Sequence, residues 1–572
     1  MQLKNLRTPI TKYTKAGNLN IAYQVFGSGP VDIVYVPGWI SNIDLMWSCP
    51  ELVAFFEELG KMGRVILFDK RGTGLSDRVV ELSTLEERME DINAVMHASG
   101  SKEAILFGHS EGGSVSALFS ATYPDKVISL ISFGIFAKRR YSKDYPWAPT
   151  DEERQQVYDM INNDWCSHKM QLESLAPSKA NDPNFMSWLT SYFRSGASPS
   201  AALKLTKMNT DVNIVDVLKY ISVPTLIMQR TNDIDVKIDE GKFISKHIKR
   251  SKFVEFDGED HLFWVGNTQE VLNEIKDFIK TTPPKPKKNK GLMTVLFGQI
   301  SNMSKSSFLC DKLKRFIDGY NTSVIHIDEE CFAVTFKTSG RAIDCGLSVL
   351  DIVKNTETLV KMGMYMKEDI QGLDHVLDKN DKHLIKCMLG NIDKNQLLVT
   401  ETIKNLQSGS RYEFNSQASV INIFSKKACK LFLVERTLKE VKETEKSNDY
   451  NYSYDTFLED IIRIIEENID NNEFSVDVLR TLIGVSERQL QRRIKELTGK
   501  SPNQLILNIR LNKAKEVLLS LDSSNISEIA FQFGFSSPSY FSKCFRKEFG
   551  ITPRVLKEKL RDATNGLQIV AL

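Results

Sequence analysis

Two copies of one pattern occupy residues 474–549, near the C-terminus. In each copy a short segment with helical apolar spacing ends at a glycine, Gly484 or Gly534, and a second amphipathic segment begins at a serine a few residues later. Glycine accepts the backbone conformations that a tight turn requires, and serine is favoured at helix N-termini. The pattern therefore predicts two units, each built from two short helices joined by a turn.

Positive charge gathers on and after the second helix of each unit. Residues 486–515 hold eight Lys or Arg and two Glu, and residues 538–561 hold seven Lys or Arg and two Glu, although the net charge of the whole chain is only +2. A charge run is usually a solvated face, but this one falls where a recognition helix meets phosphates. Residues 456–572 are therefore predicted to form an all-α double helix-turn-helix domain whose partner is double-stranded DNA.

This region resembles the DNA-binding domain of the AraC/XylS transcription regulators. The resemblance rests on the segments LQRR (490–493), KSP (500–502), IAFQFGF (529–535), FSKCFRK (541–547) and GITP (550–553). It implies a sequence-specific regulator of transcription. A long helix from 503 to about 521 is expected to space the two units. Six phenylalanines are expected to form the core of the second unit: Phe531, Phe533, Phe535, Phe541, Phe545 and Phe549.

Helical spacing places Arg488, Gln491 and Arg492 on one face of the first recognition helix, with Leu490 and Ile494 facing inward. Arg pairs with guanine and Gln with adenine in the major groove, so this face is predicted to read the operator. The matching face of the second recognition helix carries short or flexible side chains, which favour phosphate contacts over base readout. Those residues are Ser539, Ser542 and Lys543.

Residues 1–280 alternate between strand-like and helix-like segments. Short β-branched or apolar runs occur at 33–36, 65–68, 104–107, 127–133, 225–228 and 253–256, with helical segments such as 52–60, 85–99 and 113–123 between them. This alternation predicts an α/β domain with a mainly parallel sheet covered on both faces.

A GxSxG motif, residues 108–112, follows the run 104–107 and precedes a helix. Its glycines allow a sharp turn that leaves the hydroxyl of Ser110 exposed. Asp233 lies a few residues beyond the run 225–228, and His261 follows the last run. The order Ser, Asp, His, with each residue on a loop at the C-terminal end of a strand, is that of α/β hydrolases.

The whole stretch resembles that family, in particular the hydrolase domains joined to class III nucleotide cyclase domains. The resemblance implies that Ser110 is the nucleophile, His261 the general base and Asp233 the group that orients the imidazole, with Asp235 as an alternative acid. The presence of these motifs indicates the geometry of a site but does not show that the site turns over a substrate. An active serine hydrolase and a retained but idle pocket therefore both remain as alternatives.

Residues 37–39 (PGW) resemble the family's oxyanion loop, and residues 68–77 resemble its strand-end loop. The backbone N–H groups of Trp39 and Glu111 would then form the oxyanion hole. His109 is interpreted as a structural histidine. Residues 139–217 interrupt the alternation and are predicted to form a helical lid, in which most aromatic side chains hold the lid together. Residues 281–290 are predicted to be a linker.

Residues 291–437 are predicted to form an α+β domain whose order of elements resembles a class III nucleotide cyclase. The family's reactive residues are missing, because Gln299 and Glu330 stand at the positions of its two metal-binding aspartates. His383 and Cys387 align with its transition-state residues. Two-metal phosphoryl chemistry needs carboxylates and cationic donors, so cyclase activity is predicted to be absent. The resemblance implies a dimerisation or sensing role, and hence a homodimer. Residues 438–455 are read as a second linker.

Eight cysteines are scattered along the chain without a CxxC pair, which predicts reduced thiols and neither a metal site nor a cofactor. No apolar run approaches the roughly 18 residues that span a bilayer, and the N-terminus lacks an apolar signal core. A cytoplasmic protein without a membrane contact is therefore expected.

Together the three domains predict a one-component transcription regulator whose hydrolase-fold domain senses or hydrolyses an unidentified small molecule. The alternative is an active esterase-type serine hydrolase with an autoregulatory DNA-binding domain.

Overall fold

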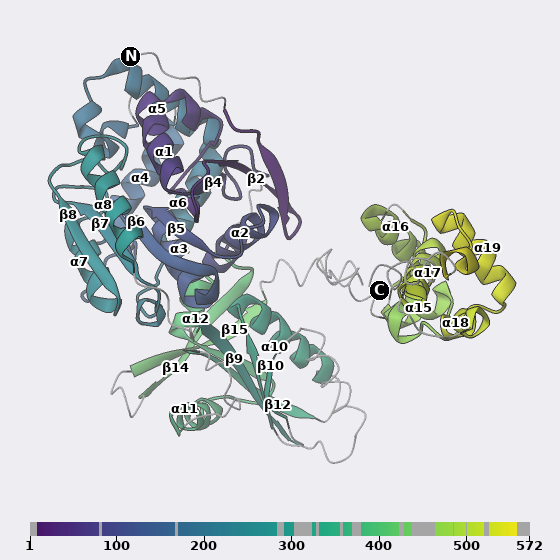
Figure 1. Cartoon of the computed structure of the whole chain (residues 1–572). Helices are drawn as coiled ribbons and strands as arrows, with labels where there is room; N and C mark the ends of the chain where they lie inside the picture. The colour runs from purple at the N-terminus through teal and green to yellow at the C-terminus, as the bar shows by residue number, and fades with distance from the viewer. Residues whose placement is uncertain are drawn as a thin grey trace. The chain divides into compact units, whose positions relative to one another are not determined.

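The computed structural model of the chain contains two compact units, Met1–Leu438 and Lys439–Leu572 (Figure 1). The structure describes residues 8–78, 83–165, 170–282, 291–301, 323–327, 331–354, 358–368, 379–421, 428–436, 461, 464–483, 485–498, 500–519 and 525–557. Among the sequence predictions, Gly484, Glu330, residues 283–290 of the first linker and the second linker, 438–455, lie outside these ranges.

Within described residues 8–282, eight strands form one sheet in the order β1-β2-β4-β3-β5-β6-β7-β8. β2 pairs antiparallel with β1 and β4, whereas all neighbours from β4 to β8 are parallel. The strands are β1 (Lys12–Ala16), β2 (Leu19–Phe26), β3 (Asp32–Val36), β4 (Arg64–Phe68), β5 (Ala104–His109), β6 (Val127–Phe133), β7 (Thr225–Arg230) and β8 (Ser251–Phe256).

Helices connect successive strands and cover both faces of this sheet, as expected for an α/β domain. A capping box between Thr84 and Glu87 fixes the start of α2, because the Thr84 side chain accepts from the Glu87 N–H and the Glu87 side chain accepts in return. The connecting helices are α1 (Pro50–Met62), α2 (Leu85–Ala98), α3 (Glu111–Thr122) and α7 (Ile238–His247), and α8 (Thr268–Thr281) follows β8.

A helical insertion separates β6 from β7, where a lid was predicted. It holds α4 (Asp151–Asp164), α5 (Pro183–Gly196) and α6 (Pro199–Thr210). Its two ends meet at a short neck: Ile214 N donates to Ala137 O over 2.8 Å, and Arg139 N donates to Val212 O over 3.2 Å. The neck ties the insertion to the C-terminal edge of the sheet.

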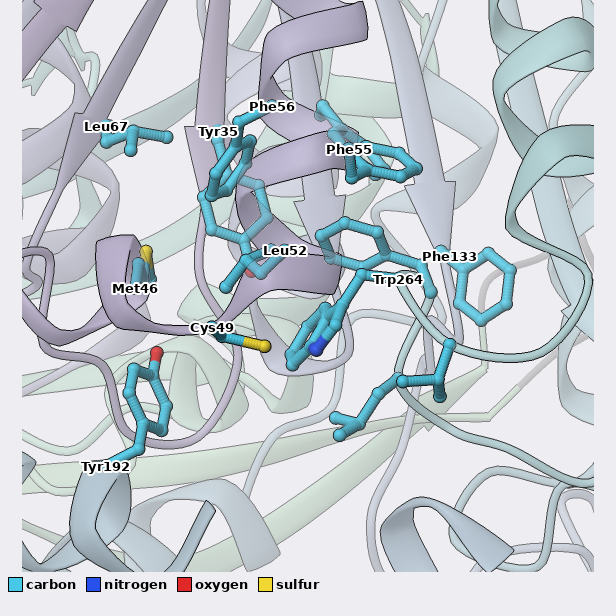
Figure 2. Close-up of a cluster of buried hydrophobic side chains, with 14 of the residues drawn as sticks. Tyr35, Met46, Cys49, Leu52, Phe55, Phe56, Leu67, Phe133, Tyr192 and Trp264 are labelled. Carbon is cyan, nitrogen blue, oxygen red and sulfur yellow. The ribbon is translucent and has the colours of Figure 1, made fainter. Parts of the chain in front are cut away.

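Alternation along the strands fills two cores. Tyr35, Leu67 and Phe133 point to the face covered by α1, α8 and the insertion, as Figure 2 shows for the cluster around Phe55 and Phe56. The intervening strand residues point to the opposite face, which α2, α3 and α7 cover. Because these strands are buried on both faces, they appear in the sequence as continuous apolar runs.

The rest of unit 1 is a second sheet of seven described strands in the order β10-β11-β9-β12-β13-β15-β14. α10 (Ser339–Val353) and α12 (Glu401–Leu406) pack on one face, and α11 (Lys379–Leu389) packs on the other. The strands are β9 (Leu292–Ser301), β10 (Ser323–Ile327), β11 (Cys331–Phe336), β12 (Leu359–Glu368), β13 (Gln396–Thr400), β14 (Tyr412–Ile421) and β15 (Ala428–Arg436).

Unit 2 contains α15 (Val476–Ile483), α16 (Glu487–Thr498), α17 (Pro502–Leu519), α18 (Ile526–Gln532) and α19 (Pro538–Phe549). The first part of α17 packs with α15 and α16, and its second part packs with α18 and α19. One long helix therefore links two small cores, as the sequence predicted.

The prediction that Phe531 belongs to the phenylalanine core was wrong. The side chain of Phe531 is 55% exposed, whereas Phe541 and Phe545 are fully buried. The buried stripe of α18 runs through Ile529 and Ala530, and Phe531 falls off that stripe at the helical spacing of 100° per residue.

Candidate active site and nucleic-acid interface

Ser110 occupies a strained turn between β5 and α3. Its φ of 53° and ψ of −123° lie outside the regions that residues with a side chain ordinarily adopt. Glycines make the turn possible, because a Cβ on Gly108 would come within 2.6 Å of Gly113 Cα. A Cβ on Gly112 would collide with the backbone oxygen of Val36. This is the geometry that presents a nucleophile at the end of a strand.

His261 lies in the loop after β8, and Asp233 lies in the loop after β7. His261 Nδ1 and Asp233 Oδ2 are 2.7 Å apart, and both side chains are buried. The backbone N–H groups of Asp235 and Val236 donate to Asp233 Oδ1 and so fix the carboxylate. Burial lowers the pKa of His261, but the charge of Asp233, the hydrogen bond to Asp233 and the charge of Asp235 together outweigh burial, and the net pKa lies above its ordinary value.

The second ring nitrogen of His261, Nε2, has no hydrogen-bond partner within the described part of the chain. It makes no hydrogen bond to the Ser110 hydroxyl there, and Oδ2 of Asp235 lies 3.5 Å away. Hydrogen bonds between a nucleophile and its base often tighten only when substrate binds. The structure thus brings Asp233 to one ring nitrogen of His261 and Asp235 to the other.

The loop 37–39 lies directly against Ser110, since a Cβ on Gly38 would be 3.2 Å from Ser110 Cβ. Glu111 opens α3, so its backbone N–H belongs to the first turn, where helical N–H groups lack an intrahelical acceptor. The Glu111 side chain is occupied elsewhere, by ion pairs to Lys70 and Arg88. Gly38, the residue before Trp39, therefore lies against Ser110 in space, and Glu111 follows Ser110 in the sequence.

His109 sits beneath the site as a neutral, buried side chain. Its Nε2 lies 3.1 Å from the backbone oxygen of His261. Burial lowers the pKa of His109 to about 3, and the charge of His261 lowers it further in the same direction. An imidazole with so low a pKa stays neutral at physiological pH, which agrees with a structural role.

Aromatic side chains of the insertion fall into two groups. Trp188 stacks on Tyr192 within α5, with 5.2 Å between ring centroids. Trp165 and Phe193 instead contact Trp39, at 5.6 and 5.3 Å between ring centroids. The second group places the insertion against the loop beside Ser110.

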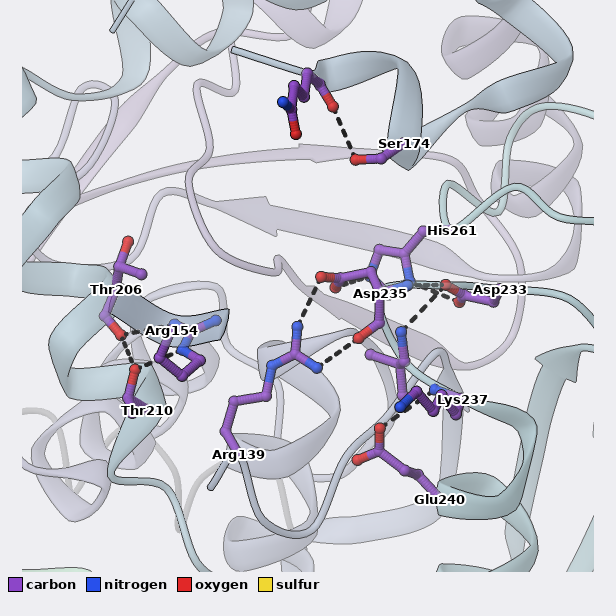
Figure 3. Close-up of polar contacts among 12 residues, drawn as sticks. Arg139, Arg154, Ser174, Thr206, Thr210, Asp233, Asp235, Lys237, Glu240 and His261 are labelled. Atoms are coloured by element: carbon purple, nitrogen blue, oxygen red, sulfur yellow. Dashed lines mark hydrogen bonds and ion pairs between the residues drawn. The ribbon is translucent and has the colours of Figure 1, made fainter. Parts of the chain in front are cut away.

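One further pair near the site was missed by sequence reasoning. The guanidinium of Arg139 donates to the backbone oxygen of Asp235 over 2.5 Å and to its Oδ1 over 2.7 Å (Figure 3). Sequence singled out Asp235 only as an alternative acid and Arg139 only as the start of the insertion. The spacing between them, 96 residues, leaves no local signal for the contact.

In unit 2, α16 separates into an outer and an inner face. Arg488, Gln491 and Arg492 are exposed, whereas Leu490 and Ile494 are fully buried. Gln491 donates to Glu487 one turn earlier over 3.0 Å. The outer face therefore carries the three side chains that helical spacing assigned to it.

α19 is the corresponding helix of the second half of unit 2. Ser537 caps it by accepting from Tyr540 N, and Gly534 has the positive φ of 69° that the preceding turn requires. Ser539 and Lys543 are exposed, and Ser542 is half-buried.

In the second sheet, Gln299 is exposed on β9. His383 and Cys387 lie one turn apart on α11, with 3.3 Å between Nε2 and Sγ. Over the described ranges of the chain, no group of three His, Cys, Asp or Glu side chains could hold a metal ion. In those same ranges no helix is long and apolar enough to span a bilayer.

Two protein families match the chain. Residues 33–267 match the family described as alpha/beta hydrolase fold, and residues 480–559 match the family described as helix-turn-helix domain. Over the first region the chain is similar to the bifunctional esterase/perhydrolase DCH of Acinetobacter calcoaceticus. That match is 24% identical over 283 residues and covers 47% of this chain and 98% of the esterase.

Over the C-terminal region the chain is 44% identical to histidine kinase P4 of Formosa agariphila across 96 residues, which is 17% of this chain and 7% of the kinase. The chain spans less than a third of the length of this kinase and of the regulators that match at 37% identity or more.

A fuller match is the uncharacterized HTH-type transcriptional regulator in the cgkA 5′ region of Pseudoalteromonas carrageenovora. It is 30% identical over 129 residues, which is 23% of this chain and 74% of that regulator. The chain therefore belongs to the HTH-type transcriptional regulators, with an AraC-type helix-turn-helix domain at its C-terminal end and an α/β hydrolase fold at its N-terminal end.

Proposed function

We propose that the protein is a one-component transcription regulator that binds operator DNA through unit 2 and senses or hydrolyses a small molecule in its hydrolase-fold domain. The observation that carries this proposal is the division of α16. Its outer face presents Arg488, Gln491 and Arg492, while Leu490 and Ile494 anchor the inner face. Arg and Gln side chains at this spacing match guanine and adenine edges in the major groove.

The proposed division of labour between the two recognition helices follows from side-chain chemistry. Ser539, Ser542 and Lys543 on α19 have short or flexible side chains that suit phosphate oxygens. α16 would then supply most of the sequence readout, and α19 would mainly anchor the protein on the duplex. With α17 as spacer, the two helices would enter successive major grooves about 34 Å apart.

A second candidate function, hydrolysis of an ester or related acyl bond, is favoured by the strained φ of Ser110 and the 2.7 Å contact between Asp233 and His261. In this scheme Ser110 Oγ attacks the acyl carbon while His261 Nε2 accepts its proton. The N–H groups of Trp39 and Glu111 bind the oxyanion. The leaving alcohol takes the proton from His261. A water molecule then attacks the acyl-enzyme while His261 Nε2 accepts its proton, and His261 returns that proton to Ser110 Oγ as the acid leaves.

We further propose that residues 291–437 are a degenerate class III cyclase-like domain that dimerises the protein or relays its signal, without cyclase activity. Gln299 supports the loss of activity, because an amide supplies no charge to a metal ion. Cys387 likewise cannot replace a guanidinium at the transition state. A homodimer in the cytoplasm, with no metal or cofactor, completes the proposal.

The DNA-binding proposal is tested with the full chain and sheared genomic DNA, by sequencing the fragments that the protein retains. The variant Arg488→Ala/Arg492→Ala is expected to lose the enriched sites, while Arg140→Ala, an exposed arginine of unit 1, keeps them. Enrichment of the same sites by the α16 variant would refute the proposal.

The hydrolase candidate is tested with 4-nitrophenyl esters of graded acyl length. Loss of turnover in Ser110→Ala, with retention in the exposed-serine control Ser200→Ala, supports an active site. If the effector response of the protein survives Ser110→Ala, the domain acts as a receptor.

A further inference from the structure

His261 lies between two carboxylates. Asp233 Oδ2 is 2.7 Å from Nδ1, and Asp235 Oδ2 is 3.5 Å from Nε2, so each ring nitrogen faces an anionic oxygen (Figure 3). A general base must present an unprotonated Nε2 to its nucleophile. In this structure the carboxylate of Asp235 lies 3.5 Å from Nε2, and Nε2 makes no hydrogen bond to Asp235 or to Ser110 in the described chain.

Asp235 does not reach this position by chance packing, because Arg139 holds it at two points. One nitrogen of the guanidinium binds the backbone oxygen of Asp235 and another binds Oδ1, which leaves Oδ2 turned to His261. Arg139 is 5% exposed, whereas the Asp235 side chain is 33% exposed. Although burial raises the pKa of Asp235, the charges of Arg139 and His261 lower it to about 2, so the carboxylate is ionised at physiological pH.

Arg139 connects this pair to the insertion. Its backbone N–H donates to Val212 O, and Lys138 pairs with Asn213 in the neighbouring bridge, so Arg139 stands in the neck where the insertion leaves and rejoins the sheet. Trp165, at the end of α4, and Phe193 of α5 contact Trp39 beside Ser110. The insertion therefore contacts both sides of the site, through the Trp39 loop and through Arg139.

The charged groups around His261 come from four elements. The carboxylates are on the loop after β7, Arg139 follows β6, His109 ends β5, and Arg230 of β7 donates to the backbone on both sides of His261. Of these groups only the two carboxylates favour the imidazolium, whereas Arg139 disfavours it and His109 is neutral. The charged and titratable groups that face His261 are therefore Asp233, Asp235, Arg139, His109 and Arg230.

We propose that Asp235 is a positioning residue for His261: held by Arg139, it occupies the Nε2 side of the imidazole in the resting site, and attack by Ser110 requires this contact to open. The inference rests on the proposed hydrolase chemistry. The neck of the insertion would then control the basicity of His261, because Arg139 lies in the neck and fixes the orientation of Asp235.

Asp235 and Ser110 compete for one nitrogen of His261. While Asp235 faces Nε2, a proton on that nitrogen is stabilised, so a smaller fraction of the imidazole is free to accept the proton of Ser110. When Asp235 turns away, the proton is less stabilised and Nε2 becomes a base. Removing the charge of Asp235 should therefore favour the neutral imidazole, and removing Arg139 should favour the imidazolium, because a cation near the ring is lost.

The experiment measures labelling of Ser110 by a fluorophosphonate as a function of pH in the full chain. The Oγ–P bond forms, the P–F bond breaks, fluoride leaves and His261 accepts the proton. Asp235→Asn, which keeps an oxygen for Arg139, is expected to shift the acid limb of the profile down by about one pH unit, a tenfold faster rate below the wild-type midpoint. Arg139→Gln is expected to shift it upward, and the exposed-carboxylate control Asp239→Asn should not move it.

A nitrogen-15 NMR titration of His261 separates this inference from the proposed activity. If no variant is labelled, the hydrolase proposal fails, yet opposite shifts of the His261 titration in Asp235→Asn and Arg139→Gln would still support the positioning role. A merely structural ion pair would lower thermal stability alike in both variants and leave the titration in place. An unmoved titration, or shifts of the same sign in two variants that keep the wild-type circular dichroism spectrum, overturns the inference.

Discussion

The carboxylate of Glu86 accepts hydrogen bonds from both the backbone N–H and the hydroxyl of Ser339, although 253 residues separate them. The two distances are 2.8 and 2.9 Å, and Gly340 N and Gln407 Nε2 complete the set of donors. Ser339 opens α10, so the carboxylate caps a helix N-terminus whose N–H groups have no acceptor within the helix. Glu86 belongs to the first turn of α2, and the contact therefore joins the two sheets of unit 1.

Replacing Glu86 with Ala should detach α10 from α2. The change leaves several buried donors without an acceptor, and such groups cost about 1–3 kcal/mol each. We expect faster hydrogen exchange at the start of α10 and a loss of stability on the order of 3 kcal/mol. Glu173→Ala, an exposed glutamate in the insertion, is the matched control and should change neither quantity. Unchanged exchange at Ser339 and Gly340 would show that the contact does not hold the sheets together.

The same contact should depend on pH. Burial raises the pKa of Glu86 to about 7, more than its hydrogen bonds lower it, so the folded chain binds a proton that the unfolded chain releases. The stability from this proton is present below the unfolded value, near 4.5, and is lost as pH rises through about 7. Urea midpoints of the wild type and Glu86→Ala should therefore differ more at about pH 5 than at about pH 8. A larger difference at the higher pH would contradict this sign.

The turn at Ser110 gives a sharper steric prediction. Gly112→Ala puts a Cβ against the backbone oxygen of Val36, which cannot move without disturbing β3, so we expect a loss of at least about 3 kcal/mol. Gly100→Ala is the matched control, because its φ of +71° strains a Cβ that has no atom within 4 Å. That change should cost only about 1 kcal/mol. Thermal melts of the two variants provide the comparison, and equal losses would mean that the backbone around Val36 shifts enough to relieve the collision at residue 112.

Much of this architecture could be predicted from sequence, because the signals are local. Apolar runs that end in loops mark β5 and β7, and the glycines around Ser110 mark the turn, so the order of elements and the loops that carry Ser110, Asp233 and His261 follow from local signals. The position of Asp235 near Nε2 of His261 could not be predicted in this way. Arg139 reaches Asp235 only because the two ends of the insertion pair at the neck, a contact set by tertiary packing across 96 residues.

Phe531 shows the same limit inside a single helix. An aromatic residue within the segment 529–535 was assigned to the core by composition, but α18 has only seven residues, and its buried stripe is narrow. Ile529 and Ala530 fill that stripe. Which side chains of a short helix are buried therefore depends on their angular position around the helix axis. The apolar character of a side chain does not decide it alone.

The two recognition helices should respond differently to substitution. Arg488→Ala on α16 removes a candidate base contact, so affinity for the preferred site should fall by about 1–3 kcal/mol while binding to unrelated DNA changes little. Lys543→Ala on α19 removes a candidate phosphate contact, so it should weaken binding to all sequences and reduce the salt slope by about 1. Titrations against matched and scrambled duplexes at several salt concentrations distinguish the two. Equal effects on both duplexes for Arg488→Ala would contradict the assignment of base readout to α16.

The carboxylate of Glu111 should be essential for the fold, independently of the oxyanion role proposed for its backbone N–H. It pairs with Lys70 and Arg88, and the three side chains are 1–6% exposed. Glu111→Gln would leave two buried cations without a counter-ion, a change that costs about 3–5 kcal/mol. Glu58→Gln breaks an exposed pair with Lys61, whose side chain is 68% exposed, and such pairs contribute less than about 1 kcal/mol. Chemical denaturation of both variants should therefore separate them clearly. A small effect at Glu111 would mean that Lys70 or Arg88 loses its proton or reaches solvent when its partner is removed.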